Sequence, residues 1–119
     1  MKPSISIVTC SYQQARYLEA TIRSVVSQGY RPLEYLVIDG GSRDGSRQII
    51  ERHSSELHYW VSESDKGQSD ALIKGFDRST GDVMGWLCSD DLLLPGALAK
   101  VGDFFSRHPE ISVVYGNAL

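Results

Sequence analysis

Two adjacent acidic residues, Asp90 and Asp91, follow an apolar run at residues 83–87. Carboxylates ~4 Å apart repel by about 4 kcal/mol at an effective dielectric constant near 20, so such a pair calls for a compensating cation or set of donors. Carboxylate oxygens suit Mg²⁺ or Mn²⁺, which often bind through one or two carboxylates together with substrate phosphates. Capping of a helix near Pro95 would explain only one of the two aspartates. The pair therefore predicts a divalent-cation site.

A third acidic residue, Asp39, ends the apolar run at residues 33–38 and is followed by Gly40 and Gly41. The glycines would let a ligand approach the backbone, with the Asp39 carboxylate projecting toward it. Asp39 could equally form an Asx-turn that only organises the loop. On the sequence alone, both interpretations stay open.

A lysine, Lys66, stands just before an expected helix start, where unpaired backbone amides favour anions. It could face a phosphate there. The alternative, which the local sequence alone favours, is an exposed loop lysine with Ser69 as the helix N-cap.

Short β-rich runs alternate with helical periods along the chain, a pattern typical of a parallel sheet. Strands are expected at residues 5–9, 33–38, 57–61, 83–87 and 111–115, and helices at residues 18–26, around 49–50, at 70–76 and from 95 to 105. The sequence thus predicts an α/β fold whose open, mostly parallel sheet carries helices on both faces, with the chain ending after the fifth strand.

Polar residues gather where these strands end. They occupy residues 9–12, 39–42, 63–67 and 89–91. In open α/β sheets, ligands bind outside the carboxyl ends of strands where the strand order reverses. We therefore expect these segments to converge on one binding edge.

Composition bounds the partners. A chain of 119 residues with 41% hydrophobic and 23% charged residues fits one globular domain. The net charge of -3, without a basic cluster, argues against a nucleic-acid partner. No apolar stretch approaches the ~18 residues of a membrane span, and no secretion signal is apparent. We expect a cytoplasmic protein in which Cys10 and Cys88 are reduced thiols and the three histidines lie on the surface.

Nucleotide-binding motifs of other classes are absent. Residues 9–15 contain no glycine, so the GxGxxG turn of a Rossmann dehydrogenase is missing, and the chain has no GxxxxGK[ST] loop. Dehydrogenase and P-loop readings are therefore excluded.

Four segments in order, residues 6–12, 34–45, 64–71 and 81–91, resemble the inverting glycosyltransferases of family two, whose donor-binding half has the Rossmann-like GT-A fold. The match runs along the whole chain. It implies that Thr9, Ser11 and Tyr12 line a base pocket. Asp39 would then accept a hydrogen bond from N3–H of uracil, or from the same group of thymine.

The resemblance also implies roles around the diphosphate. Asp90 would contact the ribose or an outer-shell water, and Asp91 would ligate the Mn²⁺ or Mg²⁺ that bridges both phosphates. Lys66 and Asp70 would border the ribose and sugar side of the site. The implied partner is a UDP- or dTDP-sugar donor.

Three residues depart from the family pattern. Ile73 and Cys88 stand where many relatives carry asparagine, and Asn117 stands where an aspartate is frequent. We expect Ile73 to weaken a contact near the donor. The Cys88 side chain should point away from the metal, because adjacent strand residues alternate faces.

The resemblance implies inverting, metal-assisted transfer to an unknown saccharide or lipid acceptor. The general base would come from a second, acceptor-binding half of the domain, which we expect residues 1–119 to lack. We therefore expect this chain to bind nucleotide weakly and to transfer little sugar. Self-association through the sheet edge after Tyr115 is also expected.

Other classes of protein compete with this interpretation. The main one is a non-catalytic, cation-dependent nucleotide-binding or regulatory α/β module. A phosphoacceptor receiver needs a further aspartate and a lysine at other strand ends. Asp39 and Lys66 could fill these roles only with a strand order that is wrong for a receiver. A purely structural interaction domain leaves the acidic edge unexplained.

Overall fold

The computed structural model describes residues 2–116 and contains a four-stranded sheet in the order β3-β2-β1-β4. The strands are β1 (Ile5–Ser11), β2 (Leu33–Asp39), β3 (Tyr59–Ser62) and β4 (Val83–Trp86). Every pairing is parallel, and β1 lies between β2 and β4. The expectation of an open parallel sheet is confirmed.

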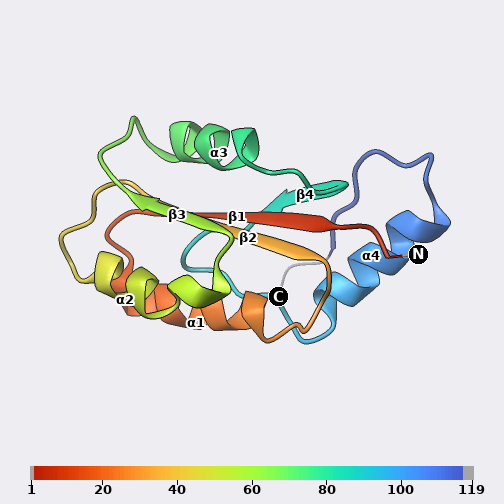
Figure 1. The fold of residues 1–119 in the computed structure, drawn as a ribbon, viewed down its shortest axis with the longest axis horizontal. Coiled ribbons are helices and arrows are strands. Elements are labelled where there is room, and N and C mark those ends of the chain that lie inside the picture. Colours follow the sequence, from red (N-terminus) through yellow and green to blue (C-terminus); the bar gives the residue numbers. More distant parts are fainter. Residues whose placement is uncertain (1, 117–119) are drawn as a thin grey trace.

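Helices cover both faces of this sheet, as expected. They are α1 (Ala15–Val26), α2 (Ser46–Arg52), α3 (Gln68–Asp77) and α4 (Ala97–Arg107), with a short 3-10 turn, η1 (Ser54–Glu56). In Figure 1, α3 lies above the strands, whereas α1 and α2 lie below them and α4 lies toward the β4 end.

The alternation of side chains along β1 and β2 produces two cores. One core joins the sheet to α1, α2 and α4, and its buried members include Ile7, Leu18, Ile22, Val37 and Leu98. The other lies under α3 and contains Val8, Cys10, Leu36, Ile38 and Ala71. Because both faces of these strands are buried, apolar residues occupy successive positions within them, as at 7–8 and 35–38.

The expected fifth strand is wrong. Residues 111–116 adopt no regular secondary structure, and β4 pairs only with β1 among the described strands. A strand forms when a neighbouring edge accepts its backbone hydrogen bonds and one side-chain face is buried. Neither condition holds here, since Val113 is 78% and Tyr115 91% exposed.

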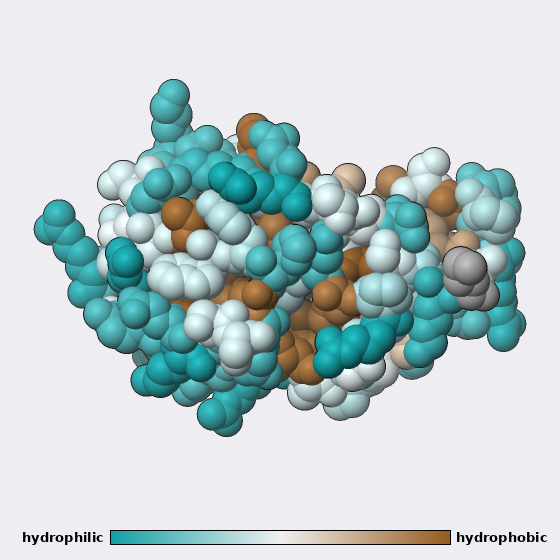
Figure 2. All heavy atoms as spheres, in the orientation of Figure 1, coloured by the Kyte–Doolittle hydropathy of each residue, from teal (hydrophilic) through white to brown (hydrophobic). Residues whose placement is uncertain are grey.

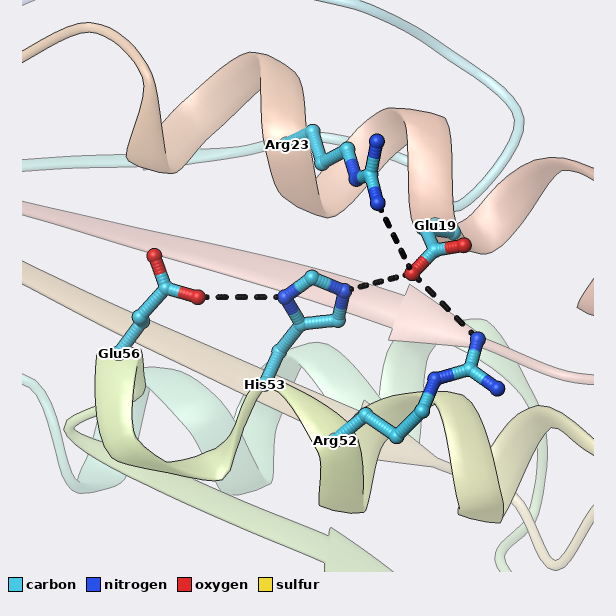
Figure 3. A network of polar contacts seen from close by, with 5 residues as sticks. All are labelled: Glu19, Arg23, Arg52, His53 and Glu56. Atoms are coloured by element: carbon cyan, nitrogen blue, oxygen red, sulfur yellow. Dashed lines mark hydrogen bonds and ion pairs between the residues drawn. The ribbon is translucent and has the colours of Figure 1, made fainter.

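A network of polar contacts joins α1 to α2 and η1 (Figure 3). His53 Nε2 lies 2.9 Å from Glu19 Oε2, and His53 Nδ1 lies 3.2 Å from Glu56 Oε1. Arg52 and Arg23 also reach the Glu19 carboxylate. The hydrogen bond with His53 is the main reason that the pKa of Glu19 lies below its usual value. The expectation of three surface histidines is therefore wrong for His53, whose side chain is only 12% exposed.

A largely apolar hollow of about 910 Å³ lies between β4, α4 and residues 111–115. Apolar atoms also surface across the middle of the face shown in Figure 2, with polar atoms on either side of them. Within residues 2–116, no helix has the length and apolar character needed to cross a membrane.

Candidate functional site

A hollow of about 560 Å³ lies at the carboxyl ends of the strands. The chain passes from β1 outward to β2 and β3, and then returns to the opposite side of β1 to form β4. The strand order therefore reverses between β1 and β4, which is where open α/β sheets bind ligands. Its lining comes from all four strand ends: Cys10, Ser11, Tyr12, Gln14, Gly40, Ser64, Asp65, Gly67, Gln68, Ala71, Cys88, Ser89 and Asp90.

The turn after β1 contributes two of the expected residues. Tyr12 lines the hollow and is largely exposed, so its ring is available to a ligand. Ser11 is buried, and its hydroxyl has no hydrogen-bond partner in the part of the chain that the structure describes. A buried hydroxyl without a partner costs about 1–3 kcal/mol, so a polar ligand group beside Ser11 would relieve this penalty.

The expectation that Thr9 lines the same pocket is wrong. Thr9 is fully buried, and its hydroxyl lies 2.8 Å from the Tyr35 hydroxyl. It points to the opposite side of the sheet from Cys10 because successive strand residues alternate faces. Thr9 therefore belongs to the core on the α1 side and not to the hollow.

Asp39 makes the loop contacts that the Asx-turn interpretation predicts. Asp39 is fully buried. Its carboxylate accepts hydrogen bonds from the Gly41 and Ser42 amides at 3.1 and 2.8 Å and from the hydroxyls of Ser42 and Ser62 at 2.7 and 2.8 Å. Three of these bonds go to Oδ2 and one goes to Oδ1, and Asp39 is not among the residues that line the hollow. This side chain therefore organises the loop after β2, and its contact with a base stays a prediction.

The two glycines after Asp39 allow the neighbouring loop to pack closely. A Cβ at Gly40 would stand 3.1 Å from Asp65 Oδ1, and a Cβ at Gly41 would stand 3.1 Å from the Ser64 amide nitrogen. Gly41 also has a positive φ of 85°, which favours glycine. The absence of side chains here leaves room for the Asp65 carboxylate, which lines the hollow.

Asp65 is the acidic residue of the hollow that the sequence analysis missed. Its Oδ1 accepts a hydrogen bond from the Gly67 amide at 2.9 Å. Oδ2 accepts none from residues 2–116 and faces the same space as Gly40. The signal was present, because Asp65 follows β3 in one of the polar strand-end segments, but the charge of Lys66 drew the assignment to that residue instead.

A second aspartate of the loop after β2, Asp44, ties this loop to the start of α1. Its carboxylate accepts hydrogen bonds from the Ala15 amide at 2.9 Å and from the Ser46 hydroxyl at 2.7 Å. Burial opposes ionisation, but these hydrogen bonds outweigh it and hold the pKa of Asp44 below its usual value. The loop and the turn after β1 therefore form one fixed rim of the hollow.

Lys66 and Asp70 are not among the residues that line the hollow. The Asp70 carboxylate accepts a hydrogen bond from the Lys66 amide at 3.0 Å, which closes the first turn of α3, and the N-cap is Gly67 rather than Ser69. Asp70 thus ties the residue before the N-cap to the first turn of α3. Lys66 is exposed and stands between Asp65 and Gly67, which line the hollow, and the roles of both residues beside a donor stay predictions.

Two family departures also find their places. Ile73 is 59% exposed on α3, and it does not line the hollow. Asn117 lies outside the described residues.

Asp90 and Asp91 both lie exposed in the connection between β4 and α4. The Asp91 amide donates to the Cys88 carbonyl at 3.0 Å and closes a turn around Asp90, and Asp90 lines the hollow. The cap of α4 is Gly96, without a side-chain cap bond, so neither aspartate caps this helix. Neither carboxylate makes a hydrogen bond or ion pair with another residue of the described chain.

Because Asp90 and Asp91 are exposed to water, their mutual repulsion is not in itself a reason to expect a cation. In water two charges ~4 Å apart interact by only about 1 kcal/mol, so this pair is tolerated without a cation. No group of three or more His, Cys, Asp or Glu side chains that could hold a metal exists within residues 2–116. The free, outward carboxylates nevertheless suit a cation that takes its other ligands from phosphate and water.

A pair of thiols forms part of the lining of the hollow. Cys10 and Cys88 are both free, and they pack together under α3. The Gln68 side-chain amide donates to Cys88 Sγ at 3.4 Å. Burial and the neighbouring Cys88 thiol raise the pKa of Cys10 to about 11. Both cysteines line the hollow, at positions 78 residues apart in the sequence.

Comparison with known proteins agrees with this architecture. The family model described as glycosyl transferase family 2 matches residues 6–118. An uncharacterized glycosyltransferase of Mycobacterium tuberculosis is 33% identical over 116 residues, which cover 96% of this chain and 44% of the relative. This chain therefore spans less than half the length of that relative.

Solved structures show the same fold. TarS of S. aureus (residues 1-349), crystallised with UDP-GlcNAc, superposes with a TM-score of 0.80 at 21% identity, covering 92% of this chain and 32% of that TarS fragment. The mannosyltransferase PcManGT from Pyrobaculum calidifontis, in complex with GDP-Man and Mn²⁺, gives a TM-score of 0.75 at 22% identity and covers 87% of this chain and 32% of that protein. The expected GT-A fold is confirmed, and the chain belongs to glycosyl transferase family 2.

Proposed function

We propose that the hollow binds the nucleoside diphosphate of a sugar donor, with uracil or thymine as the base and a divalent cation at Asp91. The observation that carries this proposal is the position of the hollow at the reversal of strand order, with Tyr12, Asp65 and Asp90 around it. UDP-GlcNAc in the similarly folded TarS supports a uracil donor.

In this proposal the base is read by Asp65, which lines the hollow, rather than by Asp39, which is buried and does not. The unpaired Oδ2 of Asp65 is a charged acceptor, suited to the N3–H of uracil or thymine. Tyr12 offers an exposed ring on which a base can stack. Guanine also presents N–H groups, and GDP-Man occupies PcManGT, so GDP is the competitor to test.

Asp90 and Asp91 supply the cation side. Asp91 would hold Mn²⁺ or Mg²⁺ together with both phosphates, while Asp90, which lines the hollow, would contact the ribose or an outer-shell water. The Mn²⁺ of PcManGT supports this proposal. When bound, a divalent cation supplies Lewis-acid stabilisation of the negative charge on the departing diphosphate.

The reaction we propose is a single displacement. An acceptor hydroxyl attacks the anomeric carbon from the side opposite the nucleoside diphosphate, which inverts the configuration. A general base must take the hydroxyl proton. We propose that a carboxylate of a separate acceptor-binding half provides it, so residues 1–119 alone bind donor and transfer little sugar to the saccharide or lipid acceptor.

The test is isothermal titration calorimetry of UDP and GDP with Mn²⁺ and with chelator, on the wild-type chain and on Asp91→Ala. We expect UDP to bind more tightly than GDP. We also expect Mn²⁺ to strengthen UDP binding about tenfold or more, and Asp91→Ala to remove this gain, since loss of a cation ligand or its support costs about 10–100-fold in affinity.

Asp77→Ala, an exposed aspartate at the end of α3, is the matched control and should behave as wild type. UDP binding that ignores both Mn²⁺ and Asp91→Ala would favour a non-catalytic nucleotide-binding module instead.

A further inference from the structure

The segment that carries the acidic pair has little regular structure of its own. We call residues 87–96, between β4 and α4, the acidic loop. A turn closed by the Asp91 amide and the Cys88 carbonyl surrounds Asp90, and a second turn at Pro95 and Gly96 leads into α4. Because the carboxylates of Asp90 and Asp91 make no hydrogen bond or ion pair with another described residue, their directions depend on how the backbone of the loop is held.

A buried hydroxyl of α1 holds that backbone on both sides of Asp90. Thr21 is fully buried. Its Oγ1 lies 2.9 Å from the Ser89 carbonyl oxygen and 2.7 Å from the Asp91 carbonyl oxygen. The same Oγ1 also lies 3.4 Å from the Tyr17 carbonyl oxygen of α1, so one hydroxyl proton is shared among three acceptors, of which the two in the loop are the nearer. Thr21 thereby draws the two carbonyls that flank Asp90 toward a single point.

Two further side chains of α1 continue this attachment along the loop. Ser24 Oγ accepts a hydrogen bond from the Leu93 amide at 3.1 Å. The Gln28 side-chain amide donates to the Leu94 carbonyl at 2.9 Å, and Gln28 Oε1 accepts from the Leu98 amide at 3.1 Å. The spacing of residues 21, 24 and 28 places them along one side of the helix, which we call the polar stripe of α1.

Apolar contacts anchor the same segment independently of the stripe. Leu98 is buried, and Leu93 packs partly buried against the core on the α1 side. These contacts keep the loop near α1 but place no constraint on the two carbonyls beside Asp90. The role that remains for Thr21 is to orient these two carbonyl groups.

We propose that Thr21 is a positioning residue for the cation–diphosphate site, supported by Ser24 and Gln28, because it fixes the backbone from which the Asp90 and Asp91 carboxylates project. This inference rests on the proposed function. Groups that orient ligating side chains in this way commonly change metal affinity about 10–100-fold when they are removed.

The test compares Thr21→Val, which removes the hydroxyl at nearly constant shape, with Thr21→Ser, which keeps it. UDP binding is measured by calorimetry with Mn²⁺ and with chelator. We expect Thr21→Val to weaken UDP binding about tenfold in Mn²⁺ and to leave binding in chelator unchanged. Thr21→Ser should restore the Mn²⁺-dependent gain.

Thr9→Val is the matched control, since it removes another fully buried hydroxyl that lies outside the hollow. It should leave both affinities unchanged. If Thr21→Val fails to fold, Ser24→Ala and Gln28→Leu carry the same expectation, with the loss confined to Mn²⁺.

The outcomes separate the two proposals. No Mn²⁺-dependent gain in the wild-type chain would overturn the cation part of the proposed function. A normal gain in wild type that persists in Thr21→Val would overturn this inference alone. Equal weakening of UDP binding with and without Mn²⁺ in Thr21→Val would also overturn this inference, because Thr21 would then have a purely structural role.

Discussion

Asp65 shows how a single side chain could set the choice of base. Replacement by asparagine keeps an oxygen for the Gly67 amide but replaces the free Oδ2 by a donor. We expect Asp65→Asn to weaken UDP binding about tenfold or more, because hydrogen bonds to charged groups contribute about 1.5–3 kcal/mol. CDP should gain relative to UDP, since N3 of cytosine accepts a hydrogen bond. Competition calorimetry of the two nucleotides measures this exchange.

The control for this variant is the unfolding midpoint, which should stay close to that of wild type. Unchanged UDP affinity in a folded Asp65→Asn protein would remove Asp65 from the base site. It would leave the cation side, which has its own test, untouched.

At this scale the sequence predicts regions better than roles. The polar ends of the strands identify the hollow, and Ser11, Tyr12 and Asp90 lie in it as expected. Asp39 and Thr9 do not, because their orientation depends on hydrogen bonds to Ser62 and Tyr35, which only the folded chain brings near. No spacing rule in the sequence contains these contacts.

Among the elements, the amino ends of β1 and β2 are joined to the turn before β4 by one carboxylate. Glu34 accepts hydrogen bonds from the Ser6 hydroxyl at 2.6 Å and the Thr80 amide at 2.8 Å. The Gly81 amide in turn donates to Ser6 Oγ at 2.9 Å. Burial opposes ionisation of Glu34, but these hydrogen bonds and nearby His58 outweigh it and lower its pKa from 4.5 to about 2.

This depressed pKa predicts a pH dependence of stability. The contribution of ionised Glu34 is complete above about pH 4.5 and is lost as the pH falls toward 2. We expect Glu34→Gln to lower the free energy of unfolding by about 1–2 kcal/mol at pH 7, and by progressively less between pH 4.5 and pH 2.5. Urea unfolding at several pH values checks this. The exposed Glu51→Gln, which loses only an ion pair with Arg47, should show almost no difference at any pH.

A gap between Glu34→Gln and wild type that stays constant from pH 7 to pH 2.5 would contradict this assignment. Glu19 and Asp44 also have lowered pKa values. They titrate in both proteins, so comparison with wild type isolates Glu34.

Elements with strong local patterns were predictable, and those that need a partner were not. The apolar stripe of Leu18, Ile22 and Val25 predicts α1, and the apolar runs predict the first four strands. Residues 111–115 have the same β-rich character, but a strand also needs an adjacent edge, and no feature of the local sequence reports whether one is in reach.

For the molecule as a whole, we predict self-association through the apolar hollow beside β4. It is lined by β4, α4 and residues 111–115, and Met84 on this edge strand is 55% exposed. Unpaired strand edges with apolar side chains tend to pair with another chain. We predict reversible self-association that grows with concentration, measured by sedimentation velocity.

Met84→Lys should lower this association, because a charge on an edge strand opposes pairing. Ile73→Lys is the matched control, since Ile73 is 59% exposed on α3, away from this hollow. It should associate as wild type does. A wild-type chain that stays monomeric at high concentration would contradict the prediction.

The lining of the hollow is drawn from both halves of the chain, which has a consequence for its integrity. Ser11, Tyr12 and Gly40 come from the first half of the chain, whereas Asp65 and Asp90 come from the second. If the polypeptide were divided in the connection before β3, neither fragment would own a complete binding surface. A nucleotide would then promote the association of two separately produced fragments, and its apparent affinity would depend on the concentrations of both fragments.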